Sequence, residues 1–182
     1  STNTINLQEQ LIQKDLPAVE HVLREEFGVA GQDFRYSALK GRSNYLCLRR
    51  WGHFRSNEFL SDDEARLLGK VAIWLGTTAT GDRGELSLFF RDNPVWSRLS
   101  AQGARECPYS TGACFLHTAR ERAENAHIVV VNHALLLSDA ALGGGLLPDY
   151  DYLIIDEAHH LEDEATRQFG FSVGHDALDE EL

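Results

Sequence analysis

The sequence lacks methionine altogether and begins at a serine, so we expect it to be a segment of a longer protein. It has no apolar stretch of the roughly 20 residues that a membrane-spanning helix needs. It also has no basic-then-apolar signal peptide. Its three cysteines are an odd number, unlike the even set of a secreted disulfide framework. These absences predict no membrane partner and a location in the reducing cytoplasm.

Lysine and arginine are scarce as well, and the net charge of −11 argues superficially against nucleic acid as a partner. The basic residues are not spread evenly. Residues 41–124 hold 12 of the 17 Lys and Arg but only 10 of the 28 Asp and Glu, which makes that segment about +2 and the rest about −13. An arginine-rich middle between acidic ends indicates two modules. The arginines could follow a phosphate backbone, or they could form ordinary surface ion pairs.

The pattern of apolar residues predicts an α/β fold. Residues 5–27 have helical spacing, with Asn6 as a possible cap and Pro17 expected to break the segment into two helices. Residues 33–41 alternate like a strand, and residues 128–131 read as a buried strand that leads into a short helix. Between about 41 and 124 this regularity is lost. That insert is expected to be mostly helical and irregular, and to need a staple such as a metal.

The stretch "YLIIDEAHH" carries the clearest chemical signal. Its four apolar residues, 152–155, predict a strand that is buried on both faces in a parallel sheet. Asp156 and Glu157 follow at the carboxyl end, where open α/β sheets bind ligands. Adjacent carboxylates there need compensation, and Mg²⁺ with substrate phosphates supplies it. The second acid can then orient or deprotonate a water. A solvated acidic turn is the simpler alternative.

The cysteines suggest a metal site in the insert. Cys47 lies in "KGRSNYLC", and Cys107 and Cys114 lie in "CPYSTGAC". Thiolates select zinc or iron–sulfur clusters. Three ligands are one too few for a closed site. His117, three residues after Cys114, makes Cys₃His zinc possible. Three unrelated cysteines that behave as small apolar residues are the alternative.

Taken together, these motifs resemble the DinG/XPD-type iron–sulfur DNA helicases of superfamily 2. "STNTINLQEQLIQKDLP" is similar to their motif Ia, "LKGRSNYLC" and "CPYSTGACFLHTARERAENAHIVVVNHALLLSD" to the entry and exit of their iron–sulfur domain, and "DYLIIDEAHHLED" to their motif II. The resemblance implies a partial RecA-like parallel sheet: motor segments at 1–40 and 125–168, the insert at 41–124, and the start of a further, truncated segment at 169–182.

The resemblance also implies roles for residues. Asp156 would hold Mg²⁺, Glu157 would position the attacking water, and His159 would link ATP hydrolysis to DNA. Cys47, Cys107 and Cys114 would bind a [4Fe–4S] cluster, and the insert would act as a strand-separating wedge. Contacts to single-stranded DNA or DNA junctions would come from motif Ia and from the entry to the insert: Thr4, Lys40, Arg42, Asn44 and Tyr45.

Two departures from the family pattern matter. No G-x-x-x-x-G-K-[ST] phosphate loop occurs, so the segment alone, without the remainder of the helicase chain, is not expected to hydrolyse ATP. A further family cysteine falls here at Gln102, so a cluster would be labile or absent. Two other functions therefore stay open: a non-catalytic nucleic-acid-binding module and a Cys₃His zinc interaction module. For Tyr45, Trp51 and Phe54, core packing and base stacking are both open.

Overall fold

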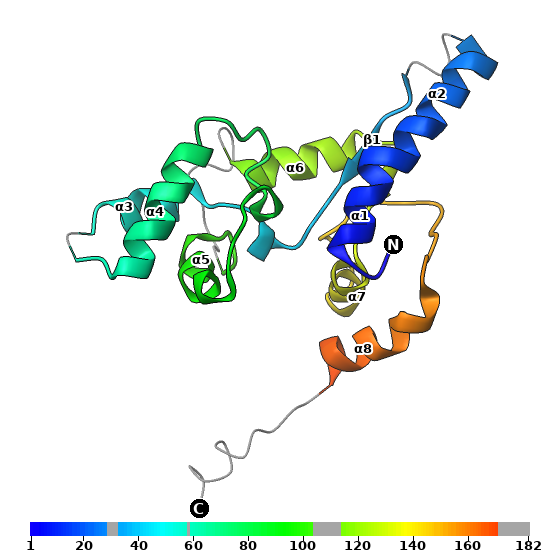
Figure 1. The fold of residues 1–182 in the computed structure, drawn as a ribbon. Helices are drawn as coiled ribbons and strands as arrows, with labels where there is room; N and C mark the ends of the chain where they lie inside the picture. Colours follow the sequence, from blue (N-terminus) through cyan, green and yellow to red (C-terminus); the bar gives the residue numbers. More distant parts are fainter. Residues whose placement is uncertain (29–32, 58, 104–113, 171–182) are drawn as a thin grey trace, which may run out of the picture. The chain divides into compact units, whose positions relative to one another are not determined.

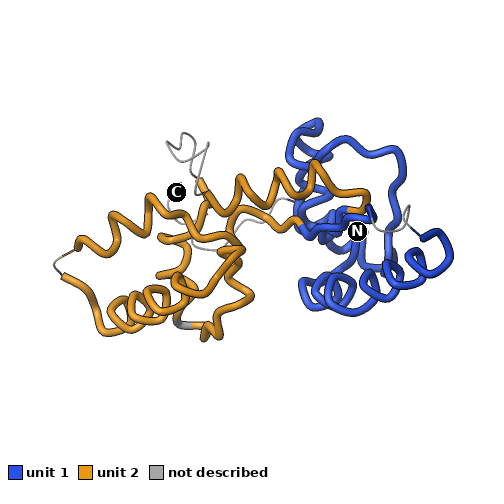
Figure 2. Tube along the Cα trace, turned by 90° about the horizontal axis from the view of Figure 1, so that it is seen from above, with its two compact units in different colours: residues 1–38, 129–182 blue, residues 39–128 orange. Residues whose placement is uncertain are grey.

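The computed structural model describes residues 1–28, 33–57, 59–103 and 114–170. The chain divides into two compact units, which are described separately here (Figure 2). Unit 1 comprises residues 1–38 and 129–182, and unit 2 comprises residues 39–128. Unit 2 spans the range of the predicted insert. No helix in the described ranges is long and apolar enough to cross a membrane.

Unit 1 begins with one continuous helical segment (Figure 1). It consists of α1 (Ile5–Gln10), a π-helical turn η1 (Leu11–Asp15) and α2 (Leu16–Phe27). Thr4 caps α1, since its hydroxyl accepts a hydrogen bond from the Leu7 N–H at 3.2 Å. The expected cap at Asn6 was therefore wrong. The prediction that Pro17 breaks the segment into two helices was wrong too. The π-helical turn leads directly into α2, and Pro17 lies in the first turn of α2, where a proline costs no helical hydrogen bond.

The strands of unit 1 are short and parallel. β1 (Tyr36–Ala38) pairs with β2 (Ile128–Val130) in a two-stranded sheet. Thr2 extends this pairing beyond β2, because its N–H donates to Val131 O at 3.0 Å and its carbonyl accepts from the His133 N–H at 2.9 Å. Val130 and Val131 are buried, as predicted for this strand, but Ile128 at its start is exposed. The mixed α/β fold class is thus confirmed.

The remaining elements of unit 1 follow β2. They are α7 (His133–Ala141), the 3₁₀ turn η6 (Ala158–His160) and α8 (Leu161–Phe169). Asp139 on α7 fixes the glycine-rich connector, since its carboxylate accepts from the N–H groups of Leu146 and Leu147 at 2.7 and 3.1 Å. Gly143–Gly145 all have positive φ angles, which only glycine adopts readily.

Unit 2 is helical, as expected for the insert. Its elements are η3 (Arg42–Asn44), α3 (Leu48–Arg55), α4 (Asp62–Trp74), η4 (Arg83–Glu85), η5 (Phe90–Asp92), α5 (Asn93–Leu99) and α6 (Phe115–Glu124). Ser61 forms a full capping box with Glu64 at the start of α4, which fixes where this helix begins. Pro94 lies in the first turn of α5, where proline costs no hydrogen bond.

Unit 2 also has an apolar core of its own. The core joins α3, α4 and α5 and consists of Leu46, Trp51, Phe54, Leu67, Val71, Trp74, Val95, Trp96 and Leu99. Two indoles meet edge to face in it, with ring centroids 6.4 Å apart. Both indole N–H groups are satisfied, one by Glu85 and one by the Ser43 carbonyl. Such burial stabilises α3–α5 without any metal.

A buried ion pair also stabilises unit 2. The Asp92 carboxylate is fully buried, and it accepts hydrogen bonds from Arg66 Nη2 at 2.5 Å and from the Phe89 N–H at 2.8 Å. Burial alone would raise the pKa of the Asp92 carboxyl, but these hydrogen bonds outweigh it and lower the pKa. A depressed pKa stabilises the fold above the carboxyl's unfolded pKa of about 3.9. That stabilisation is lost as the pH falls through the lower, folded value.

Replacing Asp92 by asparagine is expected to lower the free energy of unfolding of unit 2 by about 3 kcal/mol at pH 7, because it leaves the Arg66 guanidinium partly unpaired. The loss should shrink below about pH 4. Denaturant unfolding at pH 7 and pH 3, followed by tryptophan fluorescence, measures both effects. Asp63→Asn is the matched control, since Asp63 pairs with the same arginine at 3.0 Å but is half exposed. Equal losses in the two variants would contradict this role for Asp92.

Candidate nucleotide-hydrolysis site and cysteine-bearing insert

The apolar run before Asp156 is not a buried strand, so that prediction was wrong. Residues 152–155 belong to neither a helix nor a strand, and the side chains of Tyr152 and Ile154 are 90% and 80% exposed. The run lies beside Ser1: the Ser1 ammonium donates to the Ile154 carbonyl, and the Asp156 N–H donates to Ser1 O at 2.8 Å. An apolar run is buried on both faces only when neighbouring strands and helices cover it.

The two acids of this turn have different surroundings. The Asp156 carboxylate accepts the N–H of Glu157 at 3.0 Å and is otherwise exposed. Asp156 thus presents oxygen to the solvent, which suits a hard cation such as Mg²⁺. Glu157 turns toward the residues that follow it.

Glu157 has a left-handed backbone, with φ 53° and ψ 39°, and it is the sole non-glycine residue with positive φ in the described ranges. This conformation costs an L-residue about 1 kcal/mol or more. It reverses the chain between the run 152–155 and the 3₁₀ turn η6. The strain therefore lies at one of the residues predicted to be catalytic.

Removing the Cβ of Glu157 tests this strain. Glu157→Gly is expected to be more stable to unfolding than Glu157→Ala by about 1 kcal/mol, since only alanine resists the left-handed conformation. The same pair of substitutions at Glu162, in the first turn of α8, should give the opposite order, because glycine weakens a helix by about 0.5–1 kcal/mol relative to alanine. Denaturant unfolding of the four variants measures both differences. The same order at both positions would rule out a strained Glu157.

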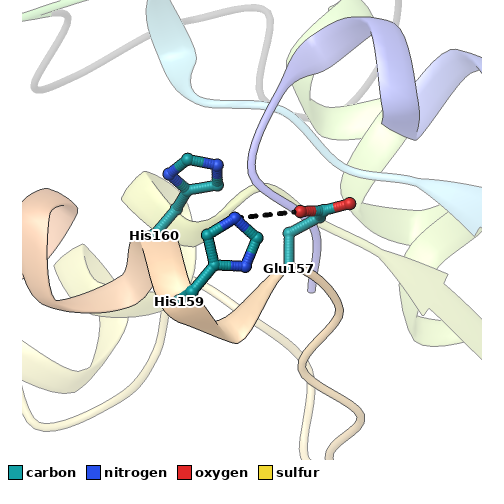
Figure 3. Close-up of side chains that lie close together, drawn as sticks. All are labelled: Glu157, His159 and His160. Carbon is teal, nitrogen blue, oxygen red and sulfur yellow. Dashed lines mark ion pairs between the residues drawn. The ribbon is translucent and has the colours of Figure 1, made fainter.

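The two histidines of η6 lie beside Glu157 (Figure 3). His159 Nε2 lies 3.3 Å from Glu157 Oε2. The rings of His159 and His160 lie with their centroids 4.0 Å apart. The structure therefore brings together Glu157 and His159, two of the three residues predicted to be catalytic, with Asp156 next to them in the chain. His160 is the N-cap residue of α8, and it brings a second imidazole to this turn.

Asn132 and His133 connect β2 to this region of unit 1. The Asn132 side chain caps α7 by accepting the Leu135 N–H at 3.0 Å. His133 is fully buried, and its Nδ1 lies 2.9 Å from the Ser1 hydroxyl. Its Nε2 is buried and has no hydrogen-bond partner among the residues that the structure describes.

In unit 2, the two described cysteines each precede a helix. Cys47 is the N-cap residue of α3 and Cys114 is that of α6, and both are free. Cys47 is buried, and it packs with Tyr45 and Ala101 against the first turns of α6. Helix N-termini carry partial positive charge, which favours bound thiolates. Cys107 lies outside the described residues.

A glycine fixes the start of α6 beside Cys114. Gly81 has φ +64°, and a Cβ built on it would lie 2.2 Å from the Phe115 ring. Its carbonyl also accepts the Leu46 N–H at 2.9 Å. The close approach of Gly81 and Phe115 therefore holds α6 against the strand-like segment that carries Cys47. Gln102 is exposed, in the turn that follows Ala101.

His117 was predicted as a fourth ligand in the zinc alternative. Its Nε2 lies 3.4 Å from Glu121 Oε1, one helical turn along α6. In the ranges that the structure describes, His117 does not join Cys47 and Cys114 in a group whose ligand atoms lie within 4.8 Å of one another.

The residues predicted to bind DNA differ in how far they are buried. Lys40 is buried, and its Nζ lies 2.5 Å from Asp82 Oδ2. Tyr45 is also buried; its hydroxyl accepts the Lys40 N–H at 3.0 Å, and burial raises the pKa of this phenol to about 12. Asn44 donates to the Gly41 carbonyl at 3.1 Å. Arg42 and Thr4 are exposed.

Arg120 on α6 is a functional candidate that the sequence did not reveal. Burial lowers the pKa of its guanidinium, and the nearby charge of Arg42 lowers it further, while Cys114 opposes the shift. Arg120 thus lies near both Arg42 and Cys114, where its positive charge would favour an anionic group. A local sequence pattern does not reveal that Arg42 and Arg120 are close, because 78 positions separate them in the chain.

Three aromatic residues of the insert were open to two interpretations, core packing and base stacking. Tyr45, Trp51 and Phe54 are 4%, 8% and 3% exposed. They pack in the interior of unit 2, which confirms the core-packing interpretation. Among the described residues of this unit, the aromatic side chains that face solvent are instead Phe59, Phe89 and Phe90, of which Phe59 and Phe90 are 91% and 92% exposed.

Comparison with known proteins places these residues in a family context. No family model matches the chain. It is 37% identical to the ATP-dependent DNA helicase YoaA of Haemophilus influenzae, over 95% of the chain and 27% of that helicase. It is 36% identical to the ATP-dependent helicase DinG of Mycobacterium tuberculosis, over 91% of the chain and 27% of that protein. The chain thus corresponds to one segment of proteins named DinG and YoaA. It spans about a quarter of these relatives.

Not every DinG-type relative is named a helicase. The protein of Bacillus subtilis that is named 3'-5' exonuclease DinG is 33% identical over 93% of the chain and 18% of its own length. Membership of the DinG-type group therefore does not by itself define the activity of the whole protein.

Proposed function

We propose that the chain is part of an ATP-dependent DNA helicase that moves along single-stranded DNA. The similarity to YoaA and DinG helicases over nine-tenths of the chain carries this proposal. In it, Asp156 holds Mg²⁺ through its exposed carboxylate, and Glu157 orients the water that attacks the γ-phosphate. His159, whose Nε2 lies 3.3 Å from Glu157 Oε2, couples ATP hydrolysis to DNA binding.

The proposal assigns unit 2 to strand separation, with a [4Fe–4S] cluster on Cys47, Cys107 and Cys114. Cys47 and Cys114 fit such a cluster in chemistry and place, because they are free thiols at helix N-termini and Cys47 packs against the first turn of α6. When bound, the cluster supplies a covalent cross-link between the start of α3 and the start of α6. Arg120, which lies near Cys114, would offset its negative charge. Because Gln102 stands where the family has a further cysteine, only three thiolates would hold the cluster, and it would be labile.

Two other functions predict different measurements. A non-catalytic nucleic-acid-binding module would bind DNA without hydrolysing ATP in any context. A Cys₃His zinc module would bind zinc through the three cysteines and would not absorb near 400 nm. The pairing of His117 with Glu121 gives the zinc module less support than the cluster.

Hydrolysis of ATP by the whole protein tests the proposal. We expect hydrolysis that needs Mg²⁺ and rises with single-stranded DNA, and we expect none from the 182-residue chain, which has no phosphate loop. DNA binding by the whole protein without hydrolysis, in the presence of Mg²⁺ and single-stranded DNA, would overturn the proposal in favour of the non-catalytic module.

Because Tyr45, Trp51 and Phe54 are buried, the proposal is that Phe90 and Phe59 stack on DNA bases instead. Phe90→Ala is expected to weaken binding of the chain to an oligothymidine by about 1–3 kcal/mol, the usual effect of removing one stacked base contact. Fluorescence anisotropy with a labelled oligonucleotide measures this loss. Ile73→Ala is the matched control, since Ile73 is 79% exposed on α4 but cannot stack. Equal effects at the two positions would show that exposed apolar area, not stacking, drives binding.

A further inference from the structure

The turn after Asp156 gathers three potential metal ligands that the proposed function does not combine. Glu157, His159 and His160 each offer one donor atom, and these atoms all lie within 4.8 Å of one another. In Figure 3 the His159 ring faces the Glu157 carboxylate, and the His160 ring lies beside it. In the described ranges, this is the one group of three or more such ligands.

The backbone explains why these side chains meet. Glu157 is in the left-handed conformation and is followed directly by the 3₁₀ turn of residues 158–160. The His160 N–H donates to the Glu157 carbonyl at 2.9 Å, which closes the turn and keeps these two residues close together. All three ligands come from four consecutive residues. The group therefore depends on one local turn and not on contacts with distant elements.

The donor set indicates which ion would bind. Two imidazoles and one carboxylate suit Zn²⁺ and similar ions such as Co²⁺ and Ni²⁺. Mg²⁺ prefers oxygen ligands only, which the neighbouring Asp156 offers. Zinc–ligand bonds of about 2.0–2.2 Å require the donors to move closer together. The exposed side chains of His159 and Glu157, 68% and 40% accessible, can make that movement by rotation.

We propose that Glu157, His159 and His160 form a binding site for a divalent ion of the zinc class, separate from the Mg²⁺ position at Asp156. Three protein ligands leave a fourth position for water or for an oxygen of a phosphate. A consequence rests on the proposed function. A zinc-class ion occupies the Glu157 carboxylate that would orient the attacking water, so it inhibits ATP hydrolysis, and a chelator reverses the inhibition.

Titration of the 182-residue chain with Zn²⁺ alone tests the site. Histidine side-chain ¹H–¹⁵N spectra report each imidazole separately, so zinc bound by the cysteines of unit 2 does not confuse the result. We expect the ring nitrogens of His159 and His160 to shift together. His159→Ala and His160→Ala should each weaken binding at the other histidine at least tenfold.

The control is His21→Ala. His21 is a similarly exposed histidine, 3.3 Å from Glu25, but it belongs to a two-residue pair. This variant should leave the His159 and His160 shifts unchanged. Absence of those shifts in excess Zn²⁺, or an equal shift of His21 at the same zinc concentration, would overturn the site. The titration contains neither ATP nor DNA. Zinc binding with no ATPase in the whole protein would therefore contradict only the helicase proposal, and normal ATPase with no zinc binding would contradict only the site.

Discussion

In the whole protein, Glu157→Gln is expected to lower ATP turnover by about 100-fold or more, in line with the usual contribution of a general base, and to leave nucleotide binding nearly unchanged. The amide has the same size as the carboxylate and still reaches the same water, but it cannot accept a proton. Asp156 and its Mg²⁺ are untouched. Steady-state hydrolysis and binding of a fluorescent ATP analogue separate the two effects.

Glu162→Gln is the matched control. Glu162 lies five residues further on, exposed in the first turn of α8, and the proposed mechanism gives it no role. The turnover of this variant should equal that of the wild type. Near-normal hydrolysis by Glu157→Gln would refute the assignment of Glu157, whatever the Glu162 variant does. Loss of nucleotide binding in Glu157→Gln would instead show that the turn had rearranged.

The second large effect concerns the cysteines. In anaerobically purified protein, Cys47→Ser is expected to speed amide exchange at least tenfold where Cys47 packs, which corresponds to about 1.4 kcal/mol of lost protection. The affected segments are residues 45–48, 99–103 and 114–120. The α4–α5 part of the unit should keep its protection, because its core of tryptophans and aliphatic side chains contains no cysteine. Loosening of the whole insert is therefore not expected.

A buried thiol can stabilise a fold without binding metal, so the control is wild-type protein whose cluster has been destroyed by air. If the three cysteines hold a cluster, the oxidised wild type should exchange like Cys47→Ser, and the brown colour should bleach at the same time. If exchange in the wild type is identical before and after oxidation, the cysteines bind nothing structural. Unit 2 would then be stabilised by packing alone.

Sequence reasoning succeeded where the signal is local. The helical spacing of residues 5–27 and the short helix after residues 128–131 were both predicted from neighbouring residues, and the structure has both. It failed where the outcome depends on distant partners. The burial of Lys40 against Asp82 joins residues 42 positions apart, and charge counting alone cannot distinguish that pair from a DNA contact.

The apolar run of residues 152–155 also shows that a local pattern does not determine burial. Its apolar composition predicts a strand that neighbours cover on both faces, whereas Tyr152 and Ile154 are exposed. Strand pairing needs a partner as well as a pattern, and here the neighbouring backbone is Ser1. The left-handed backbone of Glu157 could not be predicted from the sequence either, because glutamate has no preference for that conformation. Only the structure reveals that the turn places His159 and His160 against it.

Strand displacement by the whole protein tests the central claim most directly. A forked DNA duplex with one labelled strand is mixed with the protein, Mg²⁺ and either ATP or a non-hydrolysable analogue. We predict that the labelled strand is released with ATP alone, and that Glu157→Gln binds the fork without releasing it. Binding of the fork by the wild type with no strand release in ATP would contradict the account.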